Sequence, residues 1–99
     1  MSDKQIVVVA KAKAGDGKLA ETEKQLKNLI EPTRAEDGCI TYQLHRGEDS
    51  KDLFLFYEVW ESRQHWEAHL ETPHFKAFAE KVEELLAWPP EISVWKKES

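Results

Sequence analysis

Residues 53–78, LFLFYEVWESRQHWEAHLETPHFKAF, decide the fold. The first residues form an apolar run rich in aromatic side chains, which is typical of a strand. Ser62 then predicts the start of a helix, because a serine hydroxyl caps the free N–H groups of a first turn. Thr72 followed by Pro73 repeats that signal as a cap and a preformed first turn. The stretch therefore predicts a strand over 53–61 and two helices that are separate or kinked at Thr72.

The flanking segments complete an α+β order. Residues 5–14 open with the β-branched run IVVVA and predict a strand, and residues 39–46 alternate apolar and polar side chains with the period of a strand. Leucines at helical spacing predict a helix over 18–30, and residues 73–88 repeat that spacing until Trp-Pro-Pro ends the helix. With a last strand over 92–96, the order predicts a ferredoxin-like split βαββαβ fold: an antiparallel four-stranded sheet with helices on one face.

Length and composition point to one globular domain over residues 1–99. The 40% hydrophobic and 33% charged residues are typical of a soluble protein. The longest unbroken apolar run, 53–57, is far shorter than the roughly 18 residues of a membrane span, and the apolar run near the start is shorter than that of a secretory signal. We therefore expect a cytoplasmic protein that does not bind membranes.

Charge and cysteine content exclude several further classes. The formal net charge of −5, with neither sign gathered in a long block, is unfavourable for binding nucleic acid. Cys39 is the single cysteine, which excludes an intrachain disulfide and any site built from several cysteines.

The strands over 5–14 and 53–61 offer apolar side chains to both faces of the sheet, whereas the helices cover one face only. Leaving large apolar residues exposed is costly, at about 25 cal/mol per Å² of apolar surface. The simplest cover is a second copy of the chain, so we expect a homodimer with the two sheets face to face.

Three histidines lie within ten positions. His65 and His69 have the i, i+4 spacing of a zinc-protease motif, but the glutamate does not directly follow the first histidine and no third ligand is evident, so we predict no metal site. His65 is expected to be exposed. His69 and His74 lie on either side of the break at Pro73 and can line one cavity, where a histidine accepts protons near neutral pH. The alternative is that His74 only makes local hydrogen bonds at its helix terminus.

Four tryptophans are numerous for 99 residues. Trp60, Trp66 and Trp88 can wall a flat pocket for an aromatic ligand, although packing in the core or at a dimer interface also accounts for them. Glycine patterns that bind phosphate, flavin or nicotinamide are absent from the sequence. We therefore predict no cofactor.

Three segments together resemble the antibiotic biosynthesis monooxygenase (ABM) domain family: RAEDGCITYQLH at 34–45, FYEVWES at 56–62 and EAHLETPHFKAF at 67–78. The resemblance implies a dimeric ferredoxin-like α+β barrel with a pocket between sheet and helices. It also implies monooxygenation of a quinol or another small phenolic or polycyclic aromatic compound without a cofactor, in which the deprotonated substrate passes an electron to dioxygen.

The resemblance also assigns roles to residues. His69 or His74 would be the catalytic base or the orienting group. The substrate contacts would come from aromatic and polar side chains: Trp60, Trp66, Tyr42, Glu58 and Phe78. Haem degradation is disfavoured, because Ala79 and Ala10 stand where haem-degrading relatives carry a histidine ligand and an asparagine.

Two other functions remain open. Isomerases of the phosphorylated autoinducer-2 signal share the domain and a similar H-x-x-T-P-H segment, so the same histidines would suit an isomerase of a small carbonyl compound. The third possibility is a non-catalytic dimeric module that binds a small hydrophobic molecule.

Overall fold

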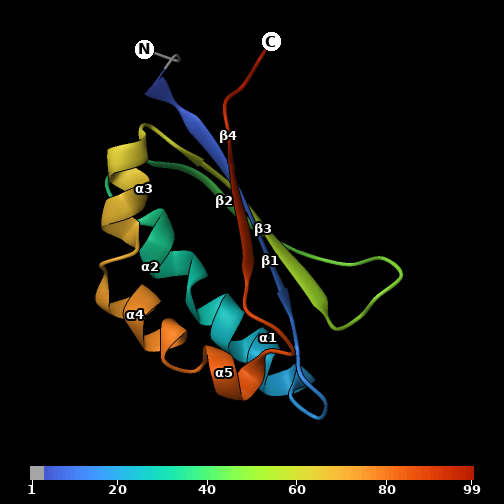
Figure 1. Ribbon diagram of the computed structural model, residues 1–99. Coiled ribbons are helices and arrows are strands. Elements are labelled where there is room, and N and C mark those ends of the chain that lie inside the picture. The colour runs from blue at the N-terminus through green and yellow to red at the C-terminus, as the bar shows by residue number, and fades with distance from the viewer. Residues whose placement is uncertain (1–3) are drawn as a thin grey trace.

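The computed structural model describes residues 4–99 and consists of one sheet covered by helices on one face (Figure 1). The sheet is antiparallel, with strand order β2-β3-β1-β4. Its strands are β1 (Ile6–Lys13), β2 (Cys39–Arg46), β3 (Leu53–Trp60) and β4 (Glu91–Trp95). The helices are α1 (Leu19–Asn28), α2 (Ile30–Arg34), α3 (Arg63–His69), α4 (Pro73–Ala79) and α5 (Val82–Leu85). The predicted ferredoxin-like α+β fold is confirmed.

Helix boundaries differ from the prediction at two places. The predicted helix over 18–30 ends at Asn28, and the short α2 that follows contains Pro32. The predicted helix over 73–88 breaks after Ala79 and resumes only as the four residues of α5. It ends there because Leu86 adopts an extended conformation and forms a bridge with Ala14 at the end of β1. Long-range pairing with the sheet therefore overrides the helical periodicity.

Helices cover only one of the two faces of the sheet, yet both faces carry apolar side chains. Phe54, Phe56 and Trp60 point toward the helices and are buried. Their neighbours point the other way, and residues paired across an antiparallel sheet share a face. The open face therefore carries an apolar group from three strands: Val7, Val9, Leu55, Tyr57, Val59 and Trp95. This confirms the prediction that the strands offer apolar side chains to both faces.

The main core lies between the sheet and the helices, where Leu26, Leu29, Phe54 and Phe56 pack together. None of the helices in the part of the chain that the structure describes is long and apolar enough to cross a membrane.

Candidate active site

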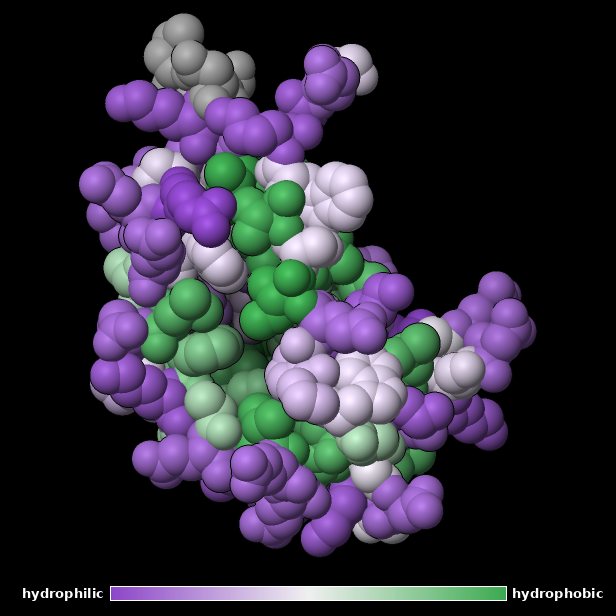
Figure 2. Space-filling model, in the orientation of Figure 1, coloured by the Kyte–Doolittle hydropathy of each residue, from purple (hydrophilic) through white to green (hydrophobic). Residues whose placement is uncertain are grey.

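A cavity of about 290 Å³ lies between the sheet and the helices. Figure 2 shows hydrophobic side chains around a hollow beside β4. Most of the lining is apolar, with aromatic rings from Phe56, Trp66, Phe75 and Phe78. The polar side chains on the wall include Tyr42, Glu58 and His69. An apolar cavity with a few polar groups is the usual form of a small-molecule site.

Thr72 fixes the two histidines relative to each other. Its Oγ1 donates a 2.7 Å hydrogen bond to the carbonyl of His69 at the end of α3, and it accepts one from the N–H of Phe75 in the first turn of α4. Pro73 fills the first position of α4, where no N–H partner is needed. The chain therefore turns between His69 and His74, and both rings come to the same side of the break.

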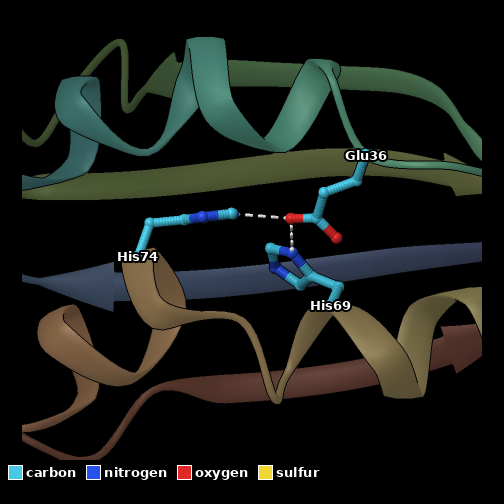
Figure 3. A group of neighbouring side chains, drawn as sticks. All are labelled: Glu36, His69 and His74. Carbon is cyan, nitrogen blue, oxygen red and sulfur yellow. Dashed lines mark hydrogen bonds and ion pairs between the residues drawn. The ribbon is translucent and has the colours of Figure 1, made fainter.

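Glu36 joins the two histidines. Its Oε2 lies 2.7 Å from Nδ1 of His69 and 2.6 Å from Nε2 of His74 (Figure 3). Sequence reasoning assigned no role to Glu36, which lies 33 and 38 residues before its partners. No local pattern marks it, since an acidic residue in a loop is ordinarily solvated.

Gly38 holds the loop that carries Glu36. Its φ of +85° lies in the left-handed region, which glycine adopts without a steric penalty. A Cβ at this position would also lie 2.2 Å from Cγ of His65. The loop can therefore approach α3 closely only with glycine here, and this approach places Glu36 against His69.

The hydrogen bonds of His69 define its chemical state. An ionised carboxylate only accepts hydrogen bonds, so a bond from His69 to such an acceptor requires the hydrogen on Nδ1. Its Nε2 makes no hydrogen bond within residues 4–99, and the ring lines the cavity. Burial lowers the pKa of His69, although the hydrogen bond and the charge of Glu36 act in the opposite direction. A neutral imidazole with a free ring nitrogen on the cavity wall is suited to accept a proton.

Glu58 is the second titratable group on the wall. It is 4% exposed, and burial raises the pKa of its carboxyl from the usual 4.5 to about 7. A hydrogen bond from Nε1 of Trp60 acts against this shift, and the charge of Glu36 adds to it. Burial also raises the pKa of Tyr42, so its hydroxyl keeps its proton. Glu58 is partly protonated near neutral pH and can donate a proton or a hydrogen bond.

The cavity brings together most of the predicted site residues. His69, Trp66, Tyr42, Glu58 and Phe78 all line it. The two remaining predictions lie behind the wall: Trp60 is fully buried with its ring 5.0 Å from that of His69, and His74 reaches Glu36 instead of the cavity.

Two other residues lie away from the cavity. Trp88 is not part of its lining. His65 was expected to be exposed, but it is partly buried: its Nδ1 lies 2.7 Å from Oγ of Ser62.

Glu36, His69 and His74 also have the donor set of a metal site, with ligand atoms within 4.8 Å of one another. Ligands at about 2.0–2.1 Å from a tetrahedral zinc ion lie about 3.3 Å apart. The separations of 2.6 and 2.7 Å at Glu36 are shorter than that and match charge-assisted hydrogen bonds. The three side chains are therefore held together by hydrogen bonds.

Comparison with known proteins shows to which family this chain belongs. The family described as antibiotic biosynthesis monooxygenase matches residues 5–81. The chain belongs to this family. The residues matched include the three site residues Glu36, His69 and His74 and the cavity-lining positions through Ala79.

Several individual proteins are similar to this chain over most of its length. "Uncharacterized protein sll1783" of Synechocystis is 40% identical over 96% of this chain, which spans 65% of that protein's length. "Putative monooxygenase YcnE" of Bacillus subtilis is 31% identical over 88% of this chain and 92% of its own. The crystal structure of PA3566 from Pseudomonas aeruginosa superimposes with a TM-score of 0.93 at 29% identity, covering 100% of this chain and 99% of that one.

Proposed function

We propose that this ABM-family protein is a monooxygenase that oxidises a quinol or another small phenolic compound with dioxygen and without a cofactor. One observation carries the proposal: His69 lines an apolar cavity while Glu36 holds its Nδ1, and its Nε2 has no hydrogen-bond partner within residues 4–99. The name of the family and of the Bacillus relative supports monooxygenation. The choice of a phenolic substrate rests on the acid–base and aromatic character of the cavity.

The chemistry begins with a proton. Nε2 of His69 takes the proton of a substrate hydroxyl, and the electron-rich phenolate passes one electron to dioxygen. The two radicals combine at a ring carbon to form a peroxide. The O–O bond then breaks as the ring C–H is lost, which leaves a new carbonyl and releases water. For a quinol, one oxygen atom ends on the ring and one in water, so quinol plus O₂ gives hydroxyquinone plus H₂O.

The lining suits this substrate class. Phe75, Phe78 and Trp66 offer flat apolar surfaces to an aromatic ring, and about 290 Å³ is at the small end of ligand cavities, which favours one or two fused rings. Tyr42 and Glu58 can hold the substrate oxygens. Because its pKa is about 7, Glu58 can also return a proton to the departing oxygen. A neutral base and a protonated acid in one cavity form a common catalytic pairing.

Oxygen uptake with a reduced naphthoquinone tests the proposal. The wild type should exceed the uncatalysed rate, and His69→Ala should lose at least about 10²-fold in kcat, the range of one general base. Glu83→Gln is the control, because Glu83 is exposed on α5, away from the open face and from the cavity lining, and should leave the rate unchanged. Rates equal to background across several quinols would contradict the oxygenase proposal.

Proton-transfer isomerisation is the second candidate, because His69 and Glu58 line the same cavity and can serve as base and acid on a small carbonyl compound of the phosphorylated autoinducer-2 type. Such a reaction needs no oxygen, so turnover under nitrogen would favour it. Quenching of tryptophan fluorescence by a quinone, without turnover of any substrate, would favour the module that only binds a ligand.

We also propose that a second copy covers the open face of the sheet. Trp95 is 58% exposed and Tyr57 38% exposed on that face, beside the valines of β1. A two-fold dimer places the same patch on both partners, so an apolar patch is complementary to itself. All the helices within residues 4–99 lie on the opposite face of the sheet, so none of them covers these side chains.

A further inference from the structure

The two histidines bound to Glu36 are not equivalent. Their side chains form a gradient of exposure: His69 is 2% exposed, Glu36 12% and His74 23%. His69 lines the cavity, and Glu36 lines a separate shallow hollow on the outer surface with Thr72 and Ala68. The network therefore runs outward from the cavity wall to the solvent.

We propose that Glu36 is the positioning residue of this site, which keeps the hydrogen of His69 on Nδ1 and leaves Nε2 free in the cavity, and that His74 acts by holding Glu36 and is not itself a base. The base role of His69 rests on the proposed function. The tautomer of His69 does not, because it is inferred from the hydrogen bond between Nδ1 and a carboxylate acceptor.

Glu36 meets the geometric requirements of this role. Its Oε2 accepts a hydrogen bond from Nδ1 of His69 at 2.7 Å, within the range of charge-assisted bonds. A neutral imidazole has one hydrogen, so fixing it on Nδ1 makes Nε2 an acceptor. The negative charge also stabilises the imidazolium that forms when Nε2 takes a proton. A carboxylate, an imidazole and a reacting hydroxyl are combined in this way in hydrolytic triads.

His74 is placed to hold Glu36 and not to meet a substrate. Its Nε2 lies 2.6 Å from the same carboxylate oxygen, and its ring is not part of the cavity lining. Because Glu36 borders a surface hollow, water can compete for its carboxylate. A second donor on Oε2 keeps that oxygen directed at His69, and the turn at Thr72 fixes the position of this donor.

Other charged and polar groups also face His69. Glu36 and His74 lie on its Nδ1 side, Tyr42 of β2 packs edge-on with ring centres 5.8 Å apart, and Glu58 of β3 lines the same cavity. Glu36 raises the pKa of His69, whereas burial and the charge of His74 lower it. Removing Glu36 should therefore lower this pKa further, and an activity that needs neutral His69 should persist to lower pH.

The direct test determines the tautomer of His69 by NMR. The ¹⁵N shifts and couplings of its ring report the tautomer, and no substrate is needed. The wild type should show one tautomer, with the hydrogen on Nδ1. Glu36→Gln should give a mixture or the opposite tautomer, because an amide can donate as well as accept. His74→Gln should keep most of the Nδ1–H form. Asp37→Asn is the matched control, since Asp37 is the exposed neighbouring carboxylate.

Enzyme kinetics provide a second test of the role of Glu36. Glu36→Gln should lower kcat with a quinol at least about 10²-fold, by loss of the base's orientation, while quinone binding changes by less than about threefold. The acidic limb of its residual kcat/KM profile should move to lower pH. His74→Gln should lose less than Glu36→Gln, because Gln can still donate to the carboxylate.

Three results would overturn the inference: an Nε2–H tautomer in the wild type, the same tautomer in Glu36→Gln as in the wild type, or a stoichiometric metal whose removal by a chelator changes the His69 signals. The two proposals fail separately. A confirmed tautomer without oxygen uptake would refute the oxygenase alone. Oxygen uptake with an unchanged tautomer in Glu36→Gln would refute the role of Glu36 alone.

Discussion

Nε1 of Trp60 donates a 2.9 Å hydrogen bond to Oε1 of Glu58, two residues earlier on the same strand. Residues i and i+2 of a strand point to the same face, so both side chains lie under the helices. Trp60 is 0% and Glu58 4% exposed. The bond satisfies a buried indole and also gives the cavity's acidic group one fixed partner, which leaves its other oxygen for a ligand.

The buried carboxyl of Glu58 should make stability depend on pH. Its pKa is about 7 in the folded protein against 4.5 normally, so the folded state binds this proton more tightly than the unfolded state. Stability should be highest below pH 4.5 as far as this group is concerned, and should fall as pH rises to 7, by up to about 3 kcal/mol.

Glu58→Gln keeps an oxygen that can accept from Trp60 and removes the titration. Its free energy of unfolding, measured in urea at pH 5 and pH 8, should therefore change less between these conditions than that of the wild type. The exposed Glu80→Gln is the matched control and should follow the wild type. An unchanged pH dependence in Glu58→Gln would mean that other groups cause it.

Replacing Thr72 should weaken the junction between α3 and α4. Thr72→Val keeps the shape but loses the hydrogen bonds to the carbonyl of His69 and from the N–H of Phe75, so the free energy of unfolding should fall by about 1–2 kcal/mol. Thr72→Ser retains the hydroxyl and should lose less than half of that amount. A loss in Thr72→Ser as large as that in Thr72→Val would show that the methyl group contributes as much as the hydroxyl, and would contradict the prediction.

Gly38→Ala should be destabilising for two separable reasons. A φ of +85° costs an alanine about 1–2 kcal/mol, and the new Cβ would lie 2.2 Å from Cγ of His65. The double variant Gly38→Ala/His65→Ala removes the contacts with the imidazole ring, at 2.2 and 2.3 Å, but keeps the backbone penalty and a 2.6 Å contact with the Cβ of residue 65. It should therefore regain only part of the stability that Gly38→Ala loses. Urea unfolding measures both. A double variant no more stable than the single one would show that the histidine moves aside at no cost.

Filling the cavity should block ligands without unfolding the protein. Ala10 lines the cavity from β1, opposite Phe56 and Ile92 in the sheet. Ala10→Leu should weaken the binding of a naphthoquinone at least about tenfold, read from the quenching of Trp66, at a stability cost within about 1–3 kcal/mol. Ala77→Leu, at an exposed position of α4, should bind like the wild type. Unchanged affinity in Ala10→Leu would move the ligand site elsewhere.

A charge on the open face should separate the proposed dimer. Light scattering of the wild type should give twice the 11.5 kDa of one chain, and Trp95→Glu should give a single chain at micromolar concentration. Burying an unpaired carboxylate in an apolar interface carries a large free-energy cost. Lys97→Glu, an exposed change two residues further on, should leave the mass unchanged. A wild type that remains a single chain at high concentration would contradict the face-to-face arrangement.

Much of the fold was readable from short-range signals. The hydroxyl of Ser62 accepts from the N–H of His65, and that of Thr72 from the N–H of Phe75, as the capping patterns predicted. Periodicity alone failed where a distant strand intervened: α5 ends because the N–H of Ala87 bonds to the carbonyl of Lys13. A helix boundary set by such a pairing has no counterpart in the local sequence.

The sequence by itself determined the order of elements, the apolar character of both sheet faces and the break between His69 and His74 at Pro73. These follow from capping, dihedral preference and side-chain period, which act over a few residues. Only the tertiary structure brought Glu36 to both histidines, placed Trp60 behind the cavity wall and buried Glu58. Glu36 meets partners more than thirty residues away, and Glu58 and Trp60 are buried, only once the helices pack on the sheet.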